Sequence, residues 1–418
     1  MRCLLSPISG GIAIAALLAT ACNGDLHPFG AGPGTDGGHI DAPIVTDTPV
    51  KKDTSVTPDA FSGVCPDNPP VGFATMSDLG GEWDGGTAGM PNLQVSGGVT
   101  GGGSGMQVTV DASDADALAE FSMYASDKMP GPLTILIDGM IAIPPPPDGG
   151  SGDVQKIRVS SNKTVAGVGD ASGFTGGGIT LTSVNNVILR NLVIDRPNSD
   201  DAGDNVDAIH IETSHQIWVD HCDLSSNGPT ATPAYDGLVD ISDGSDFVTV
   251  SWTRYHDHGD TGLVGRSDSS AAAAQDASKN HVTYDHDWFN NVLTGPRVRF
   301  GTIHVLNAFF EDVANYGVAS IDGANTLIEN SVFQNVAPPP QDDSDFGWVT
   351  TMLSSASAGS VDLVNNQTDA SDGTAVLTAQ AMISLPYAYS ADPRDAVVGL
   401  VENCAGTGIV TPLPPSKN

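Results

Sequence analysis

Short runs of apolar and β-branched residues alternate with polar turns through the middle of this chain, and the pattern returns at a steady interval. Residues 179–194, 209–224 and 239–254 each consist of a short strand, a polar turn and a second strand, and each segment starts 30 residues after the previous one. One such unit cannot bury its own apolar face, so successive units must stack. The pattern therefore predicts an all-β fold, a parallel β-solenoid whose flank offers a groove for a polymer.

A polar residue recurs at one position in the second strand of each unit. Aligning VILRNLVI, IWVDHCDL, FVTVSWTR, HVTYDHDW, IHVLNAFF and TLIENSVF places it fifth in every row, as Asn191, His221, Ser251, Asp285, Asn307 and Asn330. Stacked coils lie roughly 4.8 Å apart, so these side chains are expected to form a ladder. This structural role is favoured for His221 over a role as catalytic base. The core stack is expected to contain Val187, Ile217, Phe247 and Ile303.

The segments on either side of the repeats have different patterns. Residues 114–126 (DADALAEFSMYAS) have helical spacing after an aspartate, and residues 133–143 (LTILIDGMIAI) predict a strand. A short helix here would cap the open end of the core. From residue 337 to residue 418 the periodicity weakens and polar loops lengthen. This final stretch is expected to wrap back over the solenoid.

The charge balance limits the possible partners. The chain of 418 residues has 16 basic against 50 acidic residues, a net charge of −34. Nucleic acid and anionic membrane surfaces are poor partners for such a protein. If the substrate is itself a polyanion, contact requires either a local arginine cluster or a bound metal.

The first 62 residues predict export and a tether. Residues 1–22 have a basic start, an apolar run and small residues ahead of Cys22, the pattern of a signal peptide. Cys22 resembles the acylated cysteine of a bacterial lipoprotein, and ordinary cleavage beside an incidental cysteine is the alternative. Residues 23–62, rich in Asp, Pro, Thr and Gly, predict a disordered linker ahead of a folded domain at 63–418. The protein is expected to be secreted or held at the cell surface, with membrane contact only through a lipid at Cys22.

Three cysteines lie beyond the signal segment. Cys65 opens the folded domain and Cys404 nearly ends it, so in an oxidising compartment these two could form a bridge. Cys222 lies at an apparent core position and is expected to be a buried, small apolar residue.

Several words of the sequence, in order, resemble those of the pectate lyase family. They are SNKT (161–164) with Gly167 and Gly169, NVILRNLVI (186–194), WVDH (218–221), DGLVDI (236–241), VTVSW (248–252), LVG (263–265), PRVRFGTIHVLN (296–307), YAYSADP (387–393) and AGTG (405–408). The resemblance spans residues 70–410. It implies a right-handed, single-stranded parallel β-helix with long loops that binds acidic plant-wall polysaccharide. The family cleaves galacturonan by β-elimination, usually with Ca²⁺.

The resemblance also implies a metal site. Asp207, Asp236 and Asp240 occupy positions that the family uses for calcium, an ion that takes several oxygen ligands at about 2.3–2.6 Å. In a fully extended strand Asp236 and Asp240 would stand roughly 13 Å apart. Either the chain bends at Gly237, or Asp207 shares the ion with only one of them. Three solvated acids in turns of a very acidic protein are the alternative.

The catalytic half departs from the family pattern. The family has an arginine, its presumed base, two residues before the proline of the PRVRFG word, and Thr294 stands there in this chain. The family's substrate-binding lysine is matched by Asp260, a carboxylate that repels a polyuronate. Arg297 and Arg299 remain as predicted catalytic and substrate-binding residues, and Arg266 is a further substrate-binding candidate. Pairing with nearby acids at the rim is the alternative for Arg297 and Arg299.

Together these features predict a calcium-assisted lyase for galacturonan (pectate) that acts as a monomer. Loss of a positioned base typically costs about 10²–10⁴-fold in rate, and this keeps two alternatives open. One is a non-catalytic pectin-binding protein on a lyase scaffold. The other is a lyase for another uronic or methylated polymer, because Asp260 favours a less charged ligand.

Overall fold

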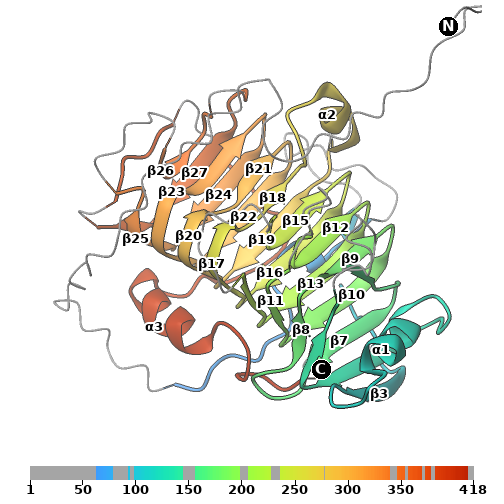
Figure 1. The fold of residues 1–418 in the computed structure, drawn as a ribbon. Helices are drawn as coiled ribbons and strands as arrows, with labels where there is room; N and C mark the ends of the chain where they lie inside the picture. The colour runs from blue at the N-terminus through green and yellow to red at the C-terminus, as the bar shows by residue number, and fades with distance from the viewer. Residues whose placement is uncertain are drawn as a thin grey trace, which may run out of the picture.

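Parallel strands stack in three walls around one continuous apolar core (Figure 1). The computed structural model describes residues 63–78, 93–94, 98–144, 156–197, 206–226, 236–276, 278–338, 346–353, 356–369, 372–377 and 382–412. Among the strands described, only β1 (Ser77–Asp78) and β2 (Leu93–Gln94) pair in antiparallel fashion. The predicted right-handed parallel β-helix is confirmed. The predicted signal peptide, the linker and Cys22 lie outside the described residues.

Most coils contribute one strand to each wall. The first wall contains β3 (Met106–Asp111), β4 (Leu133–Asp138), β7 (Lys163–Gly167), β10 (Asn185–Arg190), β13 (His215–Asp220), β16 (Asp246–Ser251), β19 (His281–Asp285), β22 (Thr302–Leu306), β24 (Asn325–Glu329) and β27 (Ser360–Val364). The second contains β5 (Met140–Ala142), β8 (Gly173–Thr175), β11 (Val193–Asp195), β14 (Asp223–Ser225), β17 (Arg254–Asp260), β20 (Trp288–Thr294), the first half of β23 (Phe309–Ile321), β25 (Val332–Val336) and β28 (Gln367–Thr368). The third contains β6 (Lys156–Arg158), β9 (Gly178–Thr182), β12 (Ile209–Glu212), β15 (Val239–Ser242), β18 (Leu263–Val264), β21 (Arg297–Arg299), the second half of β23, and β26 (Gly347–Thr350).

Equivalent apolar residues of successive coils lie on one another inside the helix. On the first wall, Val187, Ile217, Val248, Val282 and Ile303 are in register, and all are fully buried. The prediction of Phe247 in this stack is wrong. Phe247 instead packs on the outside of the wall with Phe73, Met76 and Tyr387. The coil that contains Phe247 is one residue longer than the preceding one, and a shift of one residue moves a side chain to the opposite face of a strand.

The predicted polar ladder exists, but two of its six members differ. In the six coils concerned, the residues that follow the first-wall strands and adopt the left-handed backbone conformation are Asn191, His221, Trp252, His286, Asn307 and Asn330, and Asn365 after β27 continues the row. The alignment that placed Ser251 and Asp285 in the ladder is wrong by one residue, for the same reason of coil length. Trp252 stacks between His221 and His286, with ring centroids 5.8 Å and 4.1 Å away. His221 thus has the structural position that was predicted for it.

Helices before and after the repeats pack against the solenoid. Helix α1 (Ala117–Ala125) lies at one end of the solenoid, where Phe121 is buried against Phe174, and this confirms the predicted cap (Figure 1). The final stretch does wrap back. Helix α3 (Arg394–Cys404) buries Val397 and Val401 against Phe309 of the second wall.

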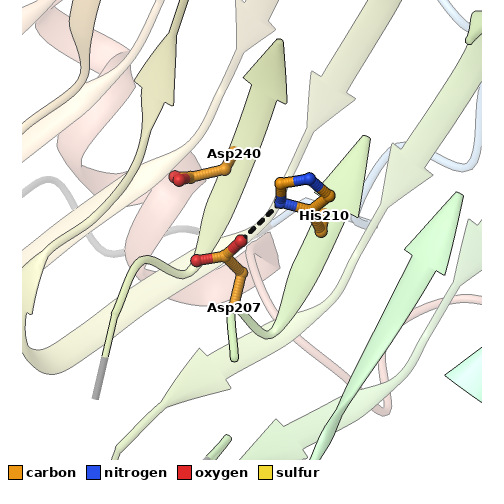
Figure 2. Close-up of side chains that lie close together, drawn as sticks. All are labelled: Asp207, His210 and Asp240. Atoms are coloured by element: carbon orange, nitrogen blue, oxygen red, sulfur yellow. Dashed lines mark hydrogen bonds and ion pairs between the residues drawn. The ribbon is translucent and has the colours of Figure 1, made fainter. Parts of the chain in front are cut away.

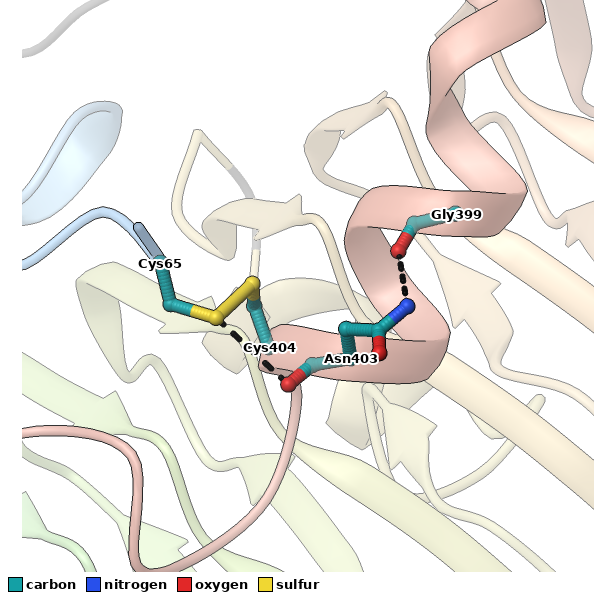
Figure 3. Close-up of a disulfide and its surroundings, with 4 residues drawn as sticks. All are labelled: Cys65, Gly399, Asn403 and Cys404. Carbon is teal, nitrogen blue, oxygen red and sulfur yellow. Dashed lines mark hydrogen bonds between the residues drawn. A yellow bond between two sulfur atoms is a disulfide. The ribbon is translucent and has the colours of Figure 1, made fainter. Parts of the chain in front are cut away.

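A disulfide joins the start and the end of the folded domain. Cys65 and Cys404 are bonded, with their Cα atoms 5.4 Å apart, as the cysteine positions predicted (Figure 3). Beyond it the chain returns toward the early coils, where the Gly408 amide donates to the Asn191 side chain at 2.8 Å. Cys222 is buried, as expected.

Two short helices complete the described elements. A 3-10 turn, η1 (Phe73–Thr75), packs on the outside of the first wall, and α2 (Ser270–Asp276) follows β18. Within the described ranges, no helix combines the length and apolarity needed to cross a membrane.

Candidate metal centre and substrate face

The outer face of the third wall brings the predicted site residues together. In β12 and β15 the alternate residues Ile209, Ile211, Val239 and Ile241 point into the core and are fully buried. The residues between them, His210 and Asp240, therefore face outward, and the two are direct partners on adjacent strands. The column continues through Leu263 to Arg297. Arg297 thus lies on the same face as Asp240, two coils further on, or about 10 Å away.

Asp207, His210 and Asp240 form a compact cluster (Figure 2). One ligand atom of each lies within 4.8 Å of those of the other two. His210 Nδ1 donates to Asp207 Oδ2 at 2.6 Å, and the other Asp207 oxygen accepts from the Gly237 amide at 2.9 Å. Asp240 is held by the Leu263 amide, which donates to its Oδ1 at 3.1 Å. Each of the three side chains is therefore held in place by at least one hydrogen bond.

The space between these side chains depends on a glycine. A Cβ atom at Gly237 would lie 2.4 Å from Asp240 Oδ1 and 3.2 Å from Asp207 Oδ1. Glycine therefore leaves room directly beside the two carboxylates. Two oxygen donors and one nitrogen donor around such a space fit a divalent cation.

Two of the three predicted metal ligands lie in the cluster. Asp207 and Asp240 belong to the cluster, whereas Asp236 precedes β15 and is not one of its three members. Its backbone carbonyl accepts from His258 Nε2 at 2.6 Å. His210 was missed, although the 30-residue repeat already places it opposite Asp240.

The electrostatics of the cluster are those of acids forced together. Burial raises the pKa of Asp240 well above its usual value, and the charges of Asp207, Asp236 and Asp260 raise it further. Burial alone would lower the pKa of His210, but its hydrogen bond to Asp207 and the nearby acids outweigh burial and raise it. Both shifts indicate a concentration of negative charge that a cation would relieve.

The three predicted arginines have different partners. Arg297 Nε donates to the hydroxyl of Tyr316 at 3.0 Å. Arg299 is buried, with its guanidinium donating to Asp268 at 2.6 Å and to the Gly265 carbonyl at 3.1 Å. Arg266 is half exposed and lies 3.1 Å from Asp243. Pairing with acids, the alternative weighed for Arg299, is what the structure shows for it and for Arg266.

Polar and acidic neighbours stabilise the positive charge of Arg297. The adjacent Tyr316 hydroxyl raises the pKa of Arg297 above its usual range despite burial, and Asp260 and Asp268 act in the same direction. This guanidinium therefore stays protonated.

The two departures from the family pattern touch each other. Asp260 in β17 and Thr294 in β20 are in register on adjacent strands of the second wall. The Thr294 hydroxyl donates to Asp260 Oδ1 at 2.8 Å. A neutral side chain and a carboxylate thus form one hydrogen-bonded pair where the resemblance implied two cations.

Comparisons with known proteins agree with this fold. Residues 95–409 match the sequence model of a family described as pectate lyase. The chain is 38% identical over 294 residues to pectate lyase plyB of Emericella nidulans, and the aligned region covers 70% of this chain and 80% of that protein. It is 33% identical over 322 residues to the pectate trisaccharide-lyase of Bacillus licheniformis, covering 76% of this chain and 86% of the relative. Among solved structures, a Bacillus pectate lyase in complex with trigalacturonate superposes with a TM-score of 0.65 at 26% identity, covering 82% of this chain and 99% of that one.

Proposed function

Because this chain belongs to the pectate lyase family, we propose that it is a polysaccharide lyase that cleaves pectate, a galacturonan, by β-elimination assisted by Ca²⁺. The single observation that carries the proposal is the column on the third wall, where Asp207 and Asp240 converge and Arg297 follows on the same face. A metal pocket and a fixed cation in line suit a chain of negatively charged sugars.

In this proposal the residues of the chain supply binding and charge. Asp207 and Asp240 hold the ion, with Asp236 close enough to raise the pKa of Asp240. When bound there, Ca²⁺ would neutralise the carboxylate of a uronate and so make the proton on the neighbouring carbon more acidic. Arg297 stays protonated, so it binds a second carboxylate of the substrate rather than accepting a proton. Arg299 orders the wall through Asp268.

Cleavage of polygalacturonate tests the proposal directly. Purified full-length protein is incubated with polygalacturonate and Ca²⁺, and the ultraviolet absorbance of the unsaturated product is followed. We expect product that disappears with EDTA and in the variant Arg297→Ala. Arg196→Ala, which removes an exposed arginine just after β11 of the second wall, is the matched control and should keep the rate. Absence of product at every pH, with no effect of EDTA, would refute the enzyme.

The Asp260–Thr294 pair favours a second candidate substrate. A carboxylate near the substrate face repels free uronates and tolerates uronates whose charge is masked as methyl esters. Under this alternative, the protein is a lyase for methylated pectin or another uronic polymer. Parallel assays on polygalacturonate and highly methylated pectin separate the two, because the alternative requires the faster rate on the methylated polymer.

The absence of arginine at Thr294 supports a third candidate, a non-catalytic pectin-binding protein. It would slow the protein in an affinity gel containing polygalacturonate but release no unsaturated product. In each case the partner is an acidic plant-wall polysaccharide rather than nucleic acid.

We also propose that the protein works outside the cell. The disulfide between Cys65 and Cys404 fits an oxidising compartment. Export through residues 1–22 and a lipid anchor at Cys22 are parts of this proposal. Mass spectrometry of the protein purified from membranes distinguishes an acylated Cys22 from simple cleavage.

A further inference from the structure

The metal pocket contains a nitrogen donor, which is unusual for a site built for calcium. Calcium is a hard ion that takes oxygen ligands. Imidazole instead favours first-row divalent metals, with Zn²⁺ among the tighter binders. His210 belongs to the three-residue cluster, and it stands directly opposite Asp240 on the adjacent strand.

The ring of His210 is oriented by its surroundings. Its Nδ1 atom faces Asp207, as Figure 2 shows, with 2.6 Å between Nδ1 and Asp207 Oδ2. Its neighbours on the same strand, Ile209 and Ile211, are fully buried in the core. The strand therefore keeps the histidine on the outer face beside Asp207 and Asp240. Nitrogen and carboxylate oxygens whose separations do not exceed 4.8 Å can surround one ion, since ligands on opposite sides of a cation at about 2.0–2.4 Å lie about 4–4.8 Å apart.

We propose that His210 is a metal ligand and that the pocket is a mixed nitrogen–oxygen site, which binds Zn²⁺ more tightly than Ca²⁺. When the imidazolium of His210 binds the ion, the ion takes the place of the proton on Nδ1, that proton leaves to solvent, and the neutral ring keeps its other proton on Nε2. The ligand set is then His210 with the carboxylates of Asp207 and Asp240. The inference uses the same pocket as the proposed function, but it concerns which cation the pocket selects.

Isothermal titration calorimetry of the metal-free full-length protein with Zn²⁺ and with Ca²⁺ tests the selectivity. The informative variant is His210→Asn, which replaces the imidazole with a shorter side chain that carries an oxygen donor. We expect the affinity for Zn²⁺ to fall by about 100-fold, the upper end of what the loss of a supporting group at a metal site costs. The affinity for Ca²⁺ should stay within about 3-fold, because an amide oxygen is an acceptable calcium ligand.

A spectroscopic measurement identifies the ligand atom without relying on activity. Pulsed electron paramagnetic resonance of one equivalent of bound Mn²⁺ should show coupling to a nitrogen nucleus, and His210→Asn should remove it. His215→Ala serves as the control, because His215 is exposed and lies on the first wall. The coupling should persist in that variant.

The outcomes separate this inference from the proposed function. Nitrogen coupling that depends on His210, together with tighter Zn²⁺ binding, supports the inference even if polygalacturonate is never cleaved. Equal Zn²⁺ affinity in the wild type and His210→Asn, or coupling that survives the substitution, overturns it even if calcium-dependent cleavage is observed. Should His210→Asn unfold, His210→Gln tests the same nitrogen with a different side chain.

Discussion

Replacing Asp240 with asparagine is expected to have opposite effects on the metal-free and the metal-bound protein. Asp240 is largely buried, and its pKa is raised by burial and by the charges of Asp207, Asp236 and Asp260. A carboxyl whose folded pKa lies above its unfolded pKa destabilises the fold once it ionises. Metal-free Asp240→Asn should therefore be more stable than metal-free wild type at neutral pH.

The pH dependence has a definite sign. Between the unfolded pKa, about 3.9, and the raised folded value, the folded wild type binds more protons than the unfolded chain. Its free energy of unfolding therefore falls as the pH rises through this window. The variant lacks this group, so its advantage over the wild type should be absent at low pH and grow with rising pH.

Bound metal should stabilise the wild type more than Asp240→Asn. An ion that binds only the folded state at 100 times its dissociation constant adds about 2.7 kcal/mol to the free energy of unfolding. For a domain of this size that corresponds to a rise in Tm of about 4 °C. Wild type should show this rise, and Asp240→Asn, with one carboxylate ligand removed, should show less than about half of it.

Thermal unfolding monitored by circular dichroism, with EDTA and with Ca²⁺, measures both effects. Asp138→Asn is the matched control, since Asp138 is exposed and lies in β4 of the first wall. It should follow the wild type under both conditions. A metal-free Asp240→Asn that is no more stable than the wild type at neutral pH would show that the acids do not repel one another. An equal rise with Ca²⁺ in variant and wild type would remove Asp240 from the metal site.

Three further results are expected. Gly237→Ala places a methyl group against Asp240 Oδ1. Calorimetry should therefore show an affinity for calcium lowered by about 10–100-fold, with the circular dichroism spectrum unchanged. An unchanged affinity would contradict a metal site beside Gly237. The double variant Asp260→Lys with Thr294→Arg should cleave polygalacturonate about 100-fold faster than wild type in initial-rate assays, and a rate that does not rise argues against the pair as the cause of weak activity. The pKa of His286 is raised from 6.5 to about 9 because Asp285 and Asp392 outweigh the effect of burial. In denaturant unfolding, the free energy of unfolding of the wild type should therefore exceed that of His286→Asn by about 3 kcal/mol below pH 6.5, and the difference should disappear as the pH passes about 9. A difference that does not change with pH refutes the assignment.

The fold was predictable because the repeat leaves few choices. A 30-residue repeat of strand, turn and strand can bury its apolar residues only by stacking, and this conclusion tolerates errors in single positions. The ladder does not tolerate them. Asn191 and His221 were placed correctly, but the next coil is one residue longer, and Phe247 and Val248 are both apolar. Nothing in the local pattern says which of these two faces the core, and only the pairing of Val248 with Ile217 decides it.

The candidate site was predictable for residues that lie one repeat apart in the sequence, because the repeat makes them neighbours on adjacent strands. Asp207 and Asp240 were found from the family words, and His210 lies 30 residues before Asp240, so the repeat contained its position as well. The partners of the arginines could not be found in this way. Arg299 meets Asp268, which follows β18 in a loop before α2, and no periodicity governs a loop. Its burial with an acid therefore appears only in three dimensions.

Asp260 and Thr294 show why two departures from a family pattern should be read as one. Each change alone would have a different effect beside the second wall: an arginine at position 294 would pair with Asp260 and have its charge neutralised by it, whereas a lysine at position 260 would have no anionic partner in Thr294. Together they form a hydrogen bond between adjacent strands, which is a stable arrangement without any cation. The positive charges in the third-wall column of the described residues are then Arg297, two coils beyond Asp240, and Arg158, two coils before His210. Because the carboxylate of Asp260 repels free uronates, we expect the pair to favour polymers with fewer free carboxylates, and a rate on highly methylated pectin that does not exceed the rate on polygalacturonate would contradict this expectation.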